Sequence, residues 1–167
     1  MGEKNLLILG AGQYGKVVRD TAVAMGGFGE IGFLDDASSL AVGKLAEYEA
    51  FCRNYCCAFV AMGNPALRKQ WLEKLEQAGF ELPVLIHPMA WASPTAVLGK
   101  GTILEPMAVV HSEAVVEPGG LICAGAVVNH NAVVGRCCQI DCGAVVASNA
   151  VVPEGTKVPS CTVWHRD

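Results

Sequence analysis

The sequence lacks the features that mark membrane, secreted and nucleic-acid-binding proteins. Its 167 residues contain no long basic run and carry a formal net charge of −4. This balance argues against nucleic acid or an acidic membrane surface as a partner. The apolar run near the N-terminus, residues 6–9, is too short for a signal peptide or a membrane span. We therefore expect a cytoplasmic protein with neither a membrane nor a nucleic-acid partner.

A CxxC pair of the zinc-finger type is also missing. The eight cysteines include the adjacent pairs Cys56-Cys57 and Cys137-Cys138. We expect reduced, mostly buried thiols and no metal. Aromatic residues make up only 7% of the chain, whereas glycine (19 residues) and valine are abundant. This composition favours short strands and tight turns over a helical bundle.

The second half of the chain repeats every six residues. From Ala96 it divides into eleven consecutive hexads in which the third residue is always aliphatic and the first is small. These third residues are Leu98, Leu104, Val110, Val116, Ile122, Val128, Val134, Ile140, Val146, Val152 and Val158. The period is typical of a parallel β-helix, in which three hexads form one triangular coil. Eleven hexads predict three to four coils, with each aliphatic side chain stacked on its equivalent eighteen residues away. AWASPT before the array and TVWHRD after it resemble imperfect end hexads.

The first half alternates between apolar runs and stretches with helical spacing. We expect strands over residues 5–9, 30–34, 57–62 and 82–86, and helices over residues 16–25, 45–55 and 65–78. Asn64 followed by Pro65 is a typical helix start. This order predicts a small parallel α/β sheet. The expected domains are residues 1–85, Rossmann-like and nucleotide-binding, and residues 86–167, the β-helix.

A glycine-rich motif follows the first expected strand and opens the first expected helix. GAGQYG, from Gly10 to Gly15, is a GxGxxG, and Asp35 lies twenty residues beyond it. Such glycines let the backbone approach a diphosphate at a helix N-terminus, and the acid can accept hydrogen bonds from a ribose or a base. The alternative is a turn that needs glycine only for close packing. The region is too short for a complete dinucleotide fold, so a nucleotide-sugar fits better than NAD.

Five segments in a fixed order now support a resemblance. LILGAGQYGKVV, FLDD, AMGNPALRK, VLIHPMA and the hexad array together span nearly all of the sequence. With them the chain resembles the bacterial sugar acyltransferase family that contains the UDP-4-amino-sugar N-acetyltransferases and the sialic-acid O-acetyltransferase-like proteins. The resemblance implies a Rossmann-like domain followed by a left-handed β-helix. It also implies a homotrimer that holds acetyl-CoA, the acyl donor, between neighbouring β-helices.

The resemblance assigns roles to individual residues. It places the nucleotide of the acceptor on the glycine-rich loop, the acid pair and the AMGNPALRK segment. The implied substrate-binding residues are Gly10, Gly12, Gln13, Tyr14, Gly15, Asp35, Asp36, Gly63 and Asn64. His130 falls where the family has its catalytic histidine. Ser148, one coil further, could bind the oxyanion through its backbone N–H, and Gln139 would lie near the CoA.

A histidine suits this chemistry on physical grounds too. An acceptor amine or hydroxyl must lose a proton as it attacks the thioester, and imidazole can take that proton near neutral pH. As the fifth residue of its hexad, His130 should be exposed; the alternative is an ordinary surface histidine. The family usually has Asp or Glu next, and here that residue is Asn131. Another acid, such as Asp141, could take its place.

We interpret the remaining conspicuous side chains as structural. His87 and Trp71 are expected in a domain junction and in the core. Arg68 and Lys69 suggest a solvated helix face, and the alternative for them is a phosphate clamp. We expect His111 to be solvated and His165 to belong to a terminal cap.

The leading hypothesis is a trimeric acyltransferase that acetylates a nucleotide-activated amino sugar, with UDP as the expected nucleotide and His130 as general base. One alternative within the same class is a sugar O-acetyltransferase. A second alternative, favoured by Asn131 and the short array, is a catalytically weakened nucleotide-sugar-binding or scaffold protein.

Overall fold

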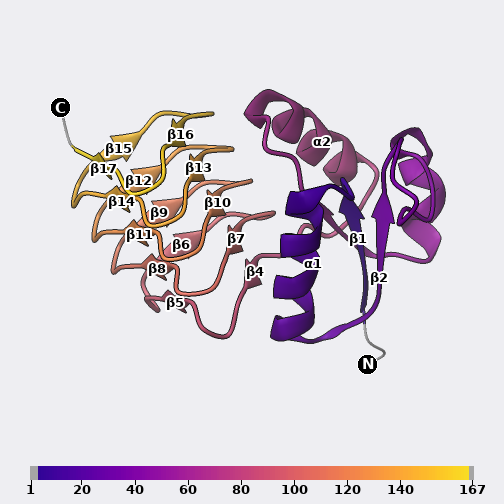
Figure 1. The fold of residues 1–167 in the computed structure, drawn as a ribbon, viewed down its shortest axis with the longest axis horizontal. Coiled ribbons are helices and arrows are strands. Elements are labelled where there is room, and N and C mark those ends of the chain that lie inside the picture. The colour runs from indigo at the N-terminus through magenta and orange to yellow at the C-terminus, as the bar shows by residue number, and fades with distance from the viewer. Residues whose placement is uncertain (1–3, 166–167) are drawn as a thin grey trace. The chain divides into compact units, whose positions relative to one another are not determined.

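The computed structural model describes residues 4–165, which divide into two compact units with the boundary between Pro83 and Val84 (Figure 1). Each unit has its own hydrophobic core. Among the described residues, no helix is both long enough and apolar enough to cross a membrane.

The first unit is a small three-layer α/β structure. Its parallel sheet has the order β2-β1-β3. The elements are β1 (Lys4–Leu9), α1 (Gln13–Met25), β2 (Phe28–Leu34), η1, a 3₁₀ helix (Leu45–Arg53), β3 (Cys57–Val60) and α2 (Pro65–Gln77). The central strand β1 is apolar without alternation because both of its faces are covered. Its residues 6–9 are fully buried.

The helix expected over residues 45–55 is present, as a 3₁₀ helix over Leu45–Arg53. One expectation for this unit needs correction. The expected fourth strand does not join the sheet, since Leu85 and Ile86 instead pair with Ile103 and Leu104 in the second unit. The six-residue period therefore begins earlier than Ala96.

The second unit is a parallel β-helix, and its described residues form fourteen two-residue strands. These are β4 (Leu85–Ile86), β5 (Trp91–Ala92), β6 (Val97–Leu98), β7 (Ile103–Leu104), β8 (Val109–Val110), β9 (Val115–Val116), β10 (Leu121–Ile122), β11 (Val127–Val128), β12 (Val133–Val134), β13 (Gln139–Ile140), β14 (Val145–Val146), β15 (Val151–Val152), β16 (Lys157–Val158) and β17 (Val163–Trp164). Every third strand stacks in one sheet. The first sheet is β4-β7-β10-β13-β16, the second is β5-β8-β11-β14-β17 and the third is β6-β9-β12-β15.

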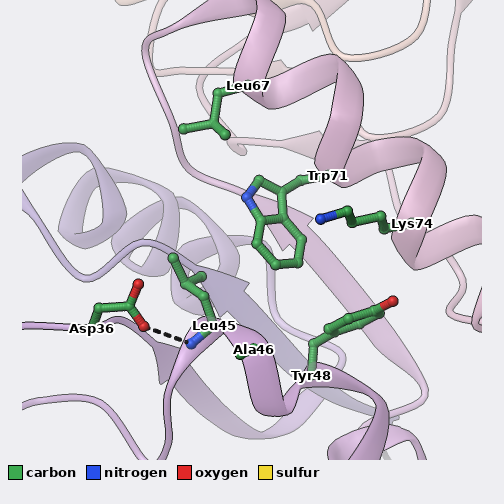
Figure 2. A pocket seen from close by; sticks show the side chains of 7 residues that line it. All are labelled: Asp36, Leu45, Ala46, Tyr48, Leu67, Trp71 and Lys74. Atoms are coloured by element: carbon green, nitrogen blue, oxygen red, sulfur yellow. Dashed lines mark hydrogen bonds between the residues drawn. The ribbon is translucent and has the colours of Figure 1, made fainter.

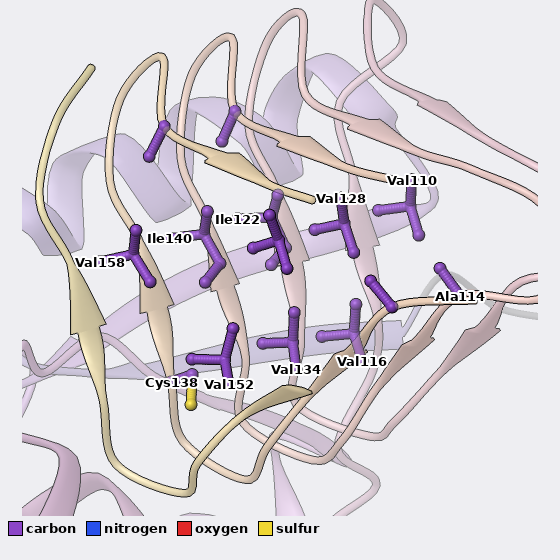
Figure 3. Close-up of a cluster of buried hydrophobic side chains, with 14 of the residues drawn as sticks. Val110, Ala114, Val116, Ile122, Val128, Val134, Cys138, Ile140, Val152 and Val158 are labelled. Carbon is purple, nitrogen blue, oxygen red and sulfur yellow. The ribbon is translucent and has the colours of Figure 1, made fainter. Parts of the chain in front are cut away.

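The register between coils is eighteen residues, as the hexads predict. Val127 pairs with Val145, and Val128 with Val146. The third residues of the hexads point inward and stack into continuous columns, such as Val116, Val134 and Val152 in the third sheet (Figure 3). All three are fully buried. At roughly 1.5–3 kcal/mol for each buried aliphatic side chain, these columns dominate the stability of the unit.

Each corner of the coil turns through a left-handed residue at the sixth position of its hexad. All eleven such residues have φ between 54° and 77°. They are Gly101, Met107, Glu113, Gly119, Gly125, Asn131, Cys137, Gly143, Asn149, Gly155 and Cys161. Glycine adopts this conformation freely, and asparagine is the next most tolerant residue. The corner geometry thus explains part of the sequence pattern between the strands.

Both imperfect end hexads belong to the β-helix. AWASPT contributes β5 and TVWHRD contributes β17. Trp164 packs against the last coil, and its indole Nε1 donates a hydrogen bond to the carbonyl of Val151 over 3.0 Å. The predicted fold class, a small Rossmann-like domain followed by a parallel β-helix, is confirmed.

Candidate functional site

The glycines of the GxGxxG loop serve two different purposes. Gly10 has φ of 103°, and a Cβ on Gly15 would lie only 2.1 Å from the carbonyl oxygen of Gly10. These two glycines are therefore required by the loop's own packing. A Cβ on Gly12, in contrast, would meet no atom within 4 Å. Gly12 leaves open space at the N-terminus of α1, where a phosphate could approach the backbone.

Asp35 ties this loop to the end of β2. Its Oδ2 accepts a hydrogen bond from the backbone N–H of Ala11 over 2.8 Å. Its Oδ1 accepts from the N–H groups of Ala37 and Ser38, both over 2.9 Å. These hydrogen bonds, that of Ala11 first, lower the pKa of the Asp35 carboxyl below its ordinary value. Asp35 thus fixes the loop's shape, a role beyond the ligand contact expected for it.

The other residues expected to bind the nucleotide surround two helix starts. Gln13 and Tyr14 are the first residues of α1, whose N-cap, Gly12, has no side chain to cap the first N–H groups. Asn64 caps α2, since its Oδ1 accepts from the N–H of Leu67 over 3.0 Å. A Cβ on Gly63 would meet no atom within 4 Å. The loops after β1 and β3 therefore both carry an open glycine.

Arg68 is not part of a solvated helix face, which corrects the expectation. It is 1% exposed, and its Nη1 donates to the carbonyls of Met62 over 2.6 Å and Gly63 over 3.2 Å. A buried guanidinium needs such acceptors. Here it braces the loop between β3 and α2. Lys69, the next residue, is half-buried.

A pocket of about 590 Å³ lies between η1 and α2 (Figure 2). Its lining is Asp36, Leu45, Ala46, Tyr48, Leu67, Trp71 and Lys74. Trp71 therefore lines a cavity, which corrects its assignment to the core. Its ring meets Tyr48 edge to face, with centroids 5.5 Å apart, and the Lys74 ammonium lies 4.6 Å from the ring centroid. Helical spacing alone placed Trp71 on an apolar face and could not show that this face lines a cavity.

His130 lies at the corner between the second and third sheets of the β-helix, after β11. Its side chain is exposed, as expected for the fifth residue of a hexad. Its ring nitrogen Nδ1 is 3.1 Å from the side-chain nitrogen of Asn131. With the amide nitrogen toward the ring, Nδ1 accepts and the ring proton is on Nε2; rotation of the amide reverses both. Asn131 thus orients the imidazole but does not fix its tautomer.

Ser148 occupies the equivalent corner one coil further. The backbone N–H of Asn149 donates to the carbonyl of His130 over 3.2 Å, which joins the two corners. Within residues 4–165 the N–H of Ser148 donates to no acceptor. The two corners therefore offer two groups on adjacent coils: a histidine ring that can accept a proton and a backbone N–H that can donate to an oxyanion.

Gln139 and Asp141 lie elsewhere on the β-helix of the same chain. Gln139 is in β13 of the first sheet, and Asp141 is at the next corner, between the first and second sheets. Asp141 forms an ion pair with Lys157 over 3.2 Å. The suggestion that Asp141 replaces the missing carboxylate beside His130 is therefore wrong within one chain.

The remaining histidines and cysteines have ordinary surroundings. His87 accepts at Nδ1 from the N–H of Met89 over 3.1 Å, a structural role. His111 is half-buried against Trp91, and His165 is exposed at the end of the array. All eight cysteines are free thiols, and four are buried. No group of three or more potential metal ligands occurs among residues 4–165.

Comparison with known proteins gives matches to both halves of the chain. Residues 5–75 match the model of the PglD N-terminal domain. A UDP-N-acetylbacillosamine N-acetyltransferase of Bacillus subtilis is 31% identical over 110 residues, which are 60% of this chain. The match spans about half (51%) of that relative's length.

Solved structures match over almost the entire chain. The acetyltransferase domain of PglB from Neisseria gonorrhoeae, in complex with acetyl coenzyme A, is 32% identical with a TM-score of 0.90. The match covers 99% of this chain and 86% of that one. PerB from Caulobacter crescentus, in complex with CoA and GDP-perosamine, is 22% identical with a TM-score of 0.74, covers 97% and 92% of the two chains, and shares the fold.

Proposed function

Because this chain belongs to the bacterial sugar acyltransferase family that contains the UDP-4-amino-sugar N-acetyltransferases, we propose that it acetylates an amino sugar carried on a nucleotide. Acetyl-CoA is the proposed acyl donor, and no metal takes part. The proposal rests on the arrangement of groups at the corner of the β-helix that carries His130. There, an exposed imidazole oriented by Asn131 lies one coil from the available N–H of Ser148. The structural likeness to an acetyltransferase domain in complex with acetyl coenzyme A supports it.

The proposed reaction is a direct transfer. The amine of the sugar attacks the thioester carbonyl, a C–N bond forms, and the C–S bond then breaks to release CoA. This step needs the Asn131 amide to be rotated so that its oxygen faces the ring: Nδ1–H then donates to that oxygen, and Nε2 of His130 accepts the proton that the amine loses. The N–H of Ser148 donates to the carbonyl oxygen as negative charge develops there. The chain itself forms no covalent intermediate, because both substrates are held together.

The first unit, residues 1–85 in this proposal, holds the nucleotide. The open glycines Gly12 and Gly63 and the uncapped N-terminus of α1 provide a place for a diphosphate. Asp35 keeps the loop in shape for this contact. The second unit, residues 86–167, carries the acetyl transfer. UDP is the proposed nucleotide, since the curated relative carries UDP in its name.

A homotrimer is part of the proposal. The outward residues of the third sheet form an aliphatic stripe in which Val97 and Val151 are 57% and 60% exposed. Val163 of the second sheet is 51% exposed. Exposed apolar surface of this kind favours burial against another copy of the chain. His130 lies at the corner between these two sheets, so assembly there would place it at a seam between subunits. CoA is proposed to bind at this seam, near Ser148 of one subunit and Gln139 of its neighbour.

The test is a thiol-release assay with acetyl-CoA and a UDP-linked 4-amino sugar. We expect turnover with the amine but not with the matching hydroxyl sugar, and a loss of about 10²–10⁴-fold in kcat for His130→Ala. His165→Ala, an exposed histidine two coils away, is the matched control and should leave the rate unchanged.

Other results would point to the rival functions. Turnover with only the hydroxyl sugar would favour an O-acetyltransferase. Binding of UDP without any turnover would favour a weakened nucleotide-sugar-binding protein, for which the neutral Asn131 beside His130 is the supporting observation. Full activity of His130→Ala would remove this histidine from the mechanism.

A further inference from the structure

Three hydroxyl side chains form a network on the coils that precede His130. They belong to Ser93, Thr95 and Ser112, and the acetyl transfer described above uses none of them. Ser112 lies eighteen residues before His130, so the two occupy equivalent positions on adjacent coils. The backbone joins them, because the N–H of Asn131 donates to the carbonyl of Ser112 over 3.1 Å. Paired strands lie about 4.8 Å apart, so a small molecule at His130 is within reach of Ser112.

The hydrogen bonds of this hydroxyl network run in one direction. Ser93, which is buried, donates from its Oγ to the Oγ of Ser112 over 3.2 Å. A hydroxyl has only one proton, so Thr95 is the donor where its Oγ1 lies 3.1 Å from the Oγ of Ser93. Ser93 also accepts from the backbone N–H of Thr95 over 3.3 Å, and Thr95 Oγ1 accepts from the N–H of Glu113 over 3.2 Å. The hydroxyls therefore donate in the order Thr95, Ser93, Ser112.

Ser112 ends the network with an unused donor. Its Oγ accepts from Ser93, and its own proton meets no acceptor among residues 4–165. The side chain is exposed, so this proton is available to a ligand. Each hydroxyl polarises the next, which strengthens the last donor of the series. Because Ser93 is buried and is held by Thr95 through two hydrogen bonds, the Ser112 oxygen has a fixed partner before any ligand arrives, which lowers the entropy lost on binding.

The place of this donor favours the acceptor sugar over the acyl donor as its ligand. In the proposed transfer, the thioester carbonyl lies at the N–H of Ser148, on the coil that follows His130. The attacking amine lies between that carbonyl and the imidazole, and the sugar extends from the amine away from the carbonyl. Ser112 is on the coil that precedes His130, which is this opposite side. The corner thus has a donor for the oxyanion on one side of His130 and a second donor on the other.

We infer that the Ser112 hydroxyl binds the acceptor sugar, by donating a hydrogen bond to the hydroxyl oxygen on the carbon next to the one that carries the amine. This role rests on the proposed function and specifies its acceptor, an amino sugar with a neighbouring hydroxyl. That oxygen is the nearest polar atom of the sugar to the amine, and it can accept from Ser112. The contact fixes how the ring is turned about the amine, so the nitrogen lone pair faces the thioester. Ser112 is therefore a residue that positions the acceptor and determines its specificity.

The experiment compares two enzymes and two sugars in the thiol-release assay. The enzymes are the unmodified chain and Ser112→Ala. The sugars are the UDP-linked 4-amino sugar and its deoxy analogue, which lacks the neighbouring hydroxyl. Ser112→Ala should lower kcat/KM for the complete sugar about tenfold, as for one lost hydrogen bond, and leave the KM for acetyl-CoA unchanged. With the deoxy analogue the two enzymes should be equally slow. An equal loss with both sugars would overturn the inference.

Three further variants separate the hydroxyl from its surroundings. Ser112→Thr keeps a hydroxyl and should keep the preference for the complete sugar. Ser93→Ala removes the donor to Ser112 and should lower kcat/KM by a smaller factor, with the complete sugar only. Ser160→Ala is the matched control, since Ser160 is also an exposed fifth residue of a hexad but lies at the corner between the first and second sheets. It should act on both sugars as the unmodified chain does. Thermal unfolding of each variant checks that it is folded.

The two proposals fail in different ways. If the unmodified chain turns over the sugar and folded Ser112→Ala distinguishes the two sugars equally well, the role of Ser112 is overturned and the acetyltransferase stays intact. Absence of turnover of either sugar by the unmodified chain would overturn both.

Discussion

The side-chain nitrogen of Asn131 lies 3.1 Å from Nδ1 of His130, and the backbone of Asn131 is left-handed, with φ of 58°. The two facts belong together. The left-handed corner turns the side chain of the sixth residue back toward that of the fifth, so the partner of the imidazole is set by the β-helix geometry. Asparagine suits the backbone, but its amide can face the ring with either end.

Replacing Asn131 with aspartate should increase the rate. A carboxylate only accepts hydrogen bonds, so Nδ1 must donate and Nε2 is left free to take a proton. It also stabilises the imidazolium that forms, as a charge-assisted hydrogen bond worth roughly 1.5–3 kcal/mol. We expect kcat for Asn131→Asp to rise about tenfold, measured by thiol release at saturating acetyl-CoA.

Asn131→Gly separates the side chain from the backbone. Glycine relaxes the left-handed corner, so the variant should fold as well as the parent. Its kcat should nevertheless fall several-fold, because the imidazole loses its partner. An Asn131→Asp chain no faster than Asn131→Gly would contradict an orienting role for this side chain.

The second and third glycines of the loop, Gly12 and Gly15, should respond differently to alanine. Gly15→Ala places a methyl 2.1 Å from the Gly10 carbonyl oxygen and should destabilise the chain by about 3 kcal/mol. Gly12→Ala meets no atom within 4 Å and should leave the thermal midpoint unchanged. Titration with UDP should instead show Gly12→Ala binding at least about tenfold more weakly, since the methyl occupies the approach to the N–H groups of α1. Tight binding by Gly12→Ala would place the diphosphate elsewhere.

Asp35 should make stability depend on acid pH. The N–H groups of Ala11, Ala37 and Ser38 lower its pKa in the folded chain below the ordinary 3.8. The stabilisation is therefore complete above about pH 4 and is lost as the pH falls through the folded-state pKa. Asp35→Asn sets an amide N–H₂ against one of these donors and should cost about 2 kcal/mol at pH 7. Urea unfolding should show that the difference in unfolding free energy between the parent and Asp35→Asn becomes smaller at pH 2–3.

Asp20→Asn provides the matched control for that experiment. Asp20 is an exposed carboxylate on α1 that meets the neighbouring Arg19. An exposed ion pair contributes little, so the unfolding free energy of Asp20→Asn should match that of the parent at both pH values. If Asp35→Asn lowered the unfolding free energy by the same amount at both pH values, the stabilisation by Asp35 would not depend on its ionisation.

Adjacent valines of β15 should separate folding from assembly. Val152 is fully buried in the prism, whereas Val151 is 60% exposed. Val152→Ala should lower the unfolding free energy by about 2 kcal/mol through lost burial and the cavity it leaves. Val151→Glu should leave each β-helix folded but convert the proposed trimer to monomer, as measured by light scattering. A Val151→Glu chain of unchanged mass would exclude the third sheet from the interface.

The β-helix could be predicted from sequence because each of its rules is local and repeated. A small first residue, an inward third residue such as Val134 and a tolerant sixth residue recur through the array. The start of the array could not be located by the same rule, since Leu85 and Ile86 read as one more strand of the α/β sheet. Only their pairing with Ile103 and Leu104 assigns them to the first coil.

Residues whose role depends on a distant partner were beyond sequence reasoning. Arg68 lies on a helix in a polar stretch of the sequence. Nothing in its neighbouring residues indicates that its guanidinium is buried and donates to the carbonyls of Met62 and Gly63. Trp71 fits the spacing of a buried helix face, but its surroundings depend on Tyr48 from η1. The acid pair was predicted to bind the nucleotide, yet the division of labour between Asp35 and Asp36 follows from hydrogen bonds to separate segments.

The left-handed corners have a consequence for how such a chain can change over time. Because the turn is made by the backbone of the sixth residue, many fourth and fifth positions can carry different side chains, as His111, Asn129 and Ala147 do in one fourth-position column. Gly99 and Gly135 are exceptions, since a Cβ there would lie 2.4 Å and 2.7 Å from backbone atoms of the next coil. The β-helix therefore has exposed corner positions at a fixed spacing of eighteen residues. A new catalytic side chain can arise at one of them by substitution, without a change of fold.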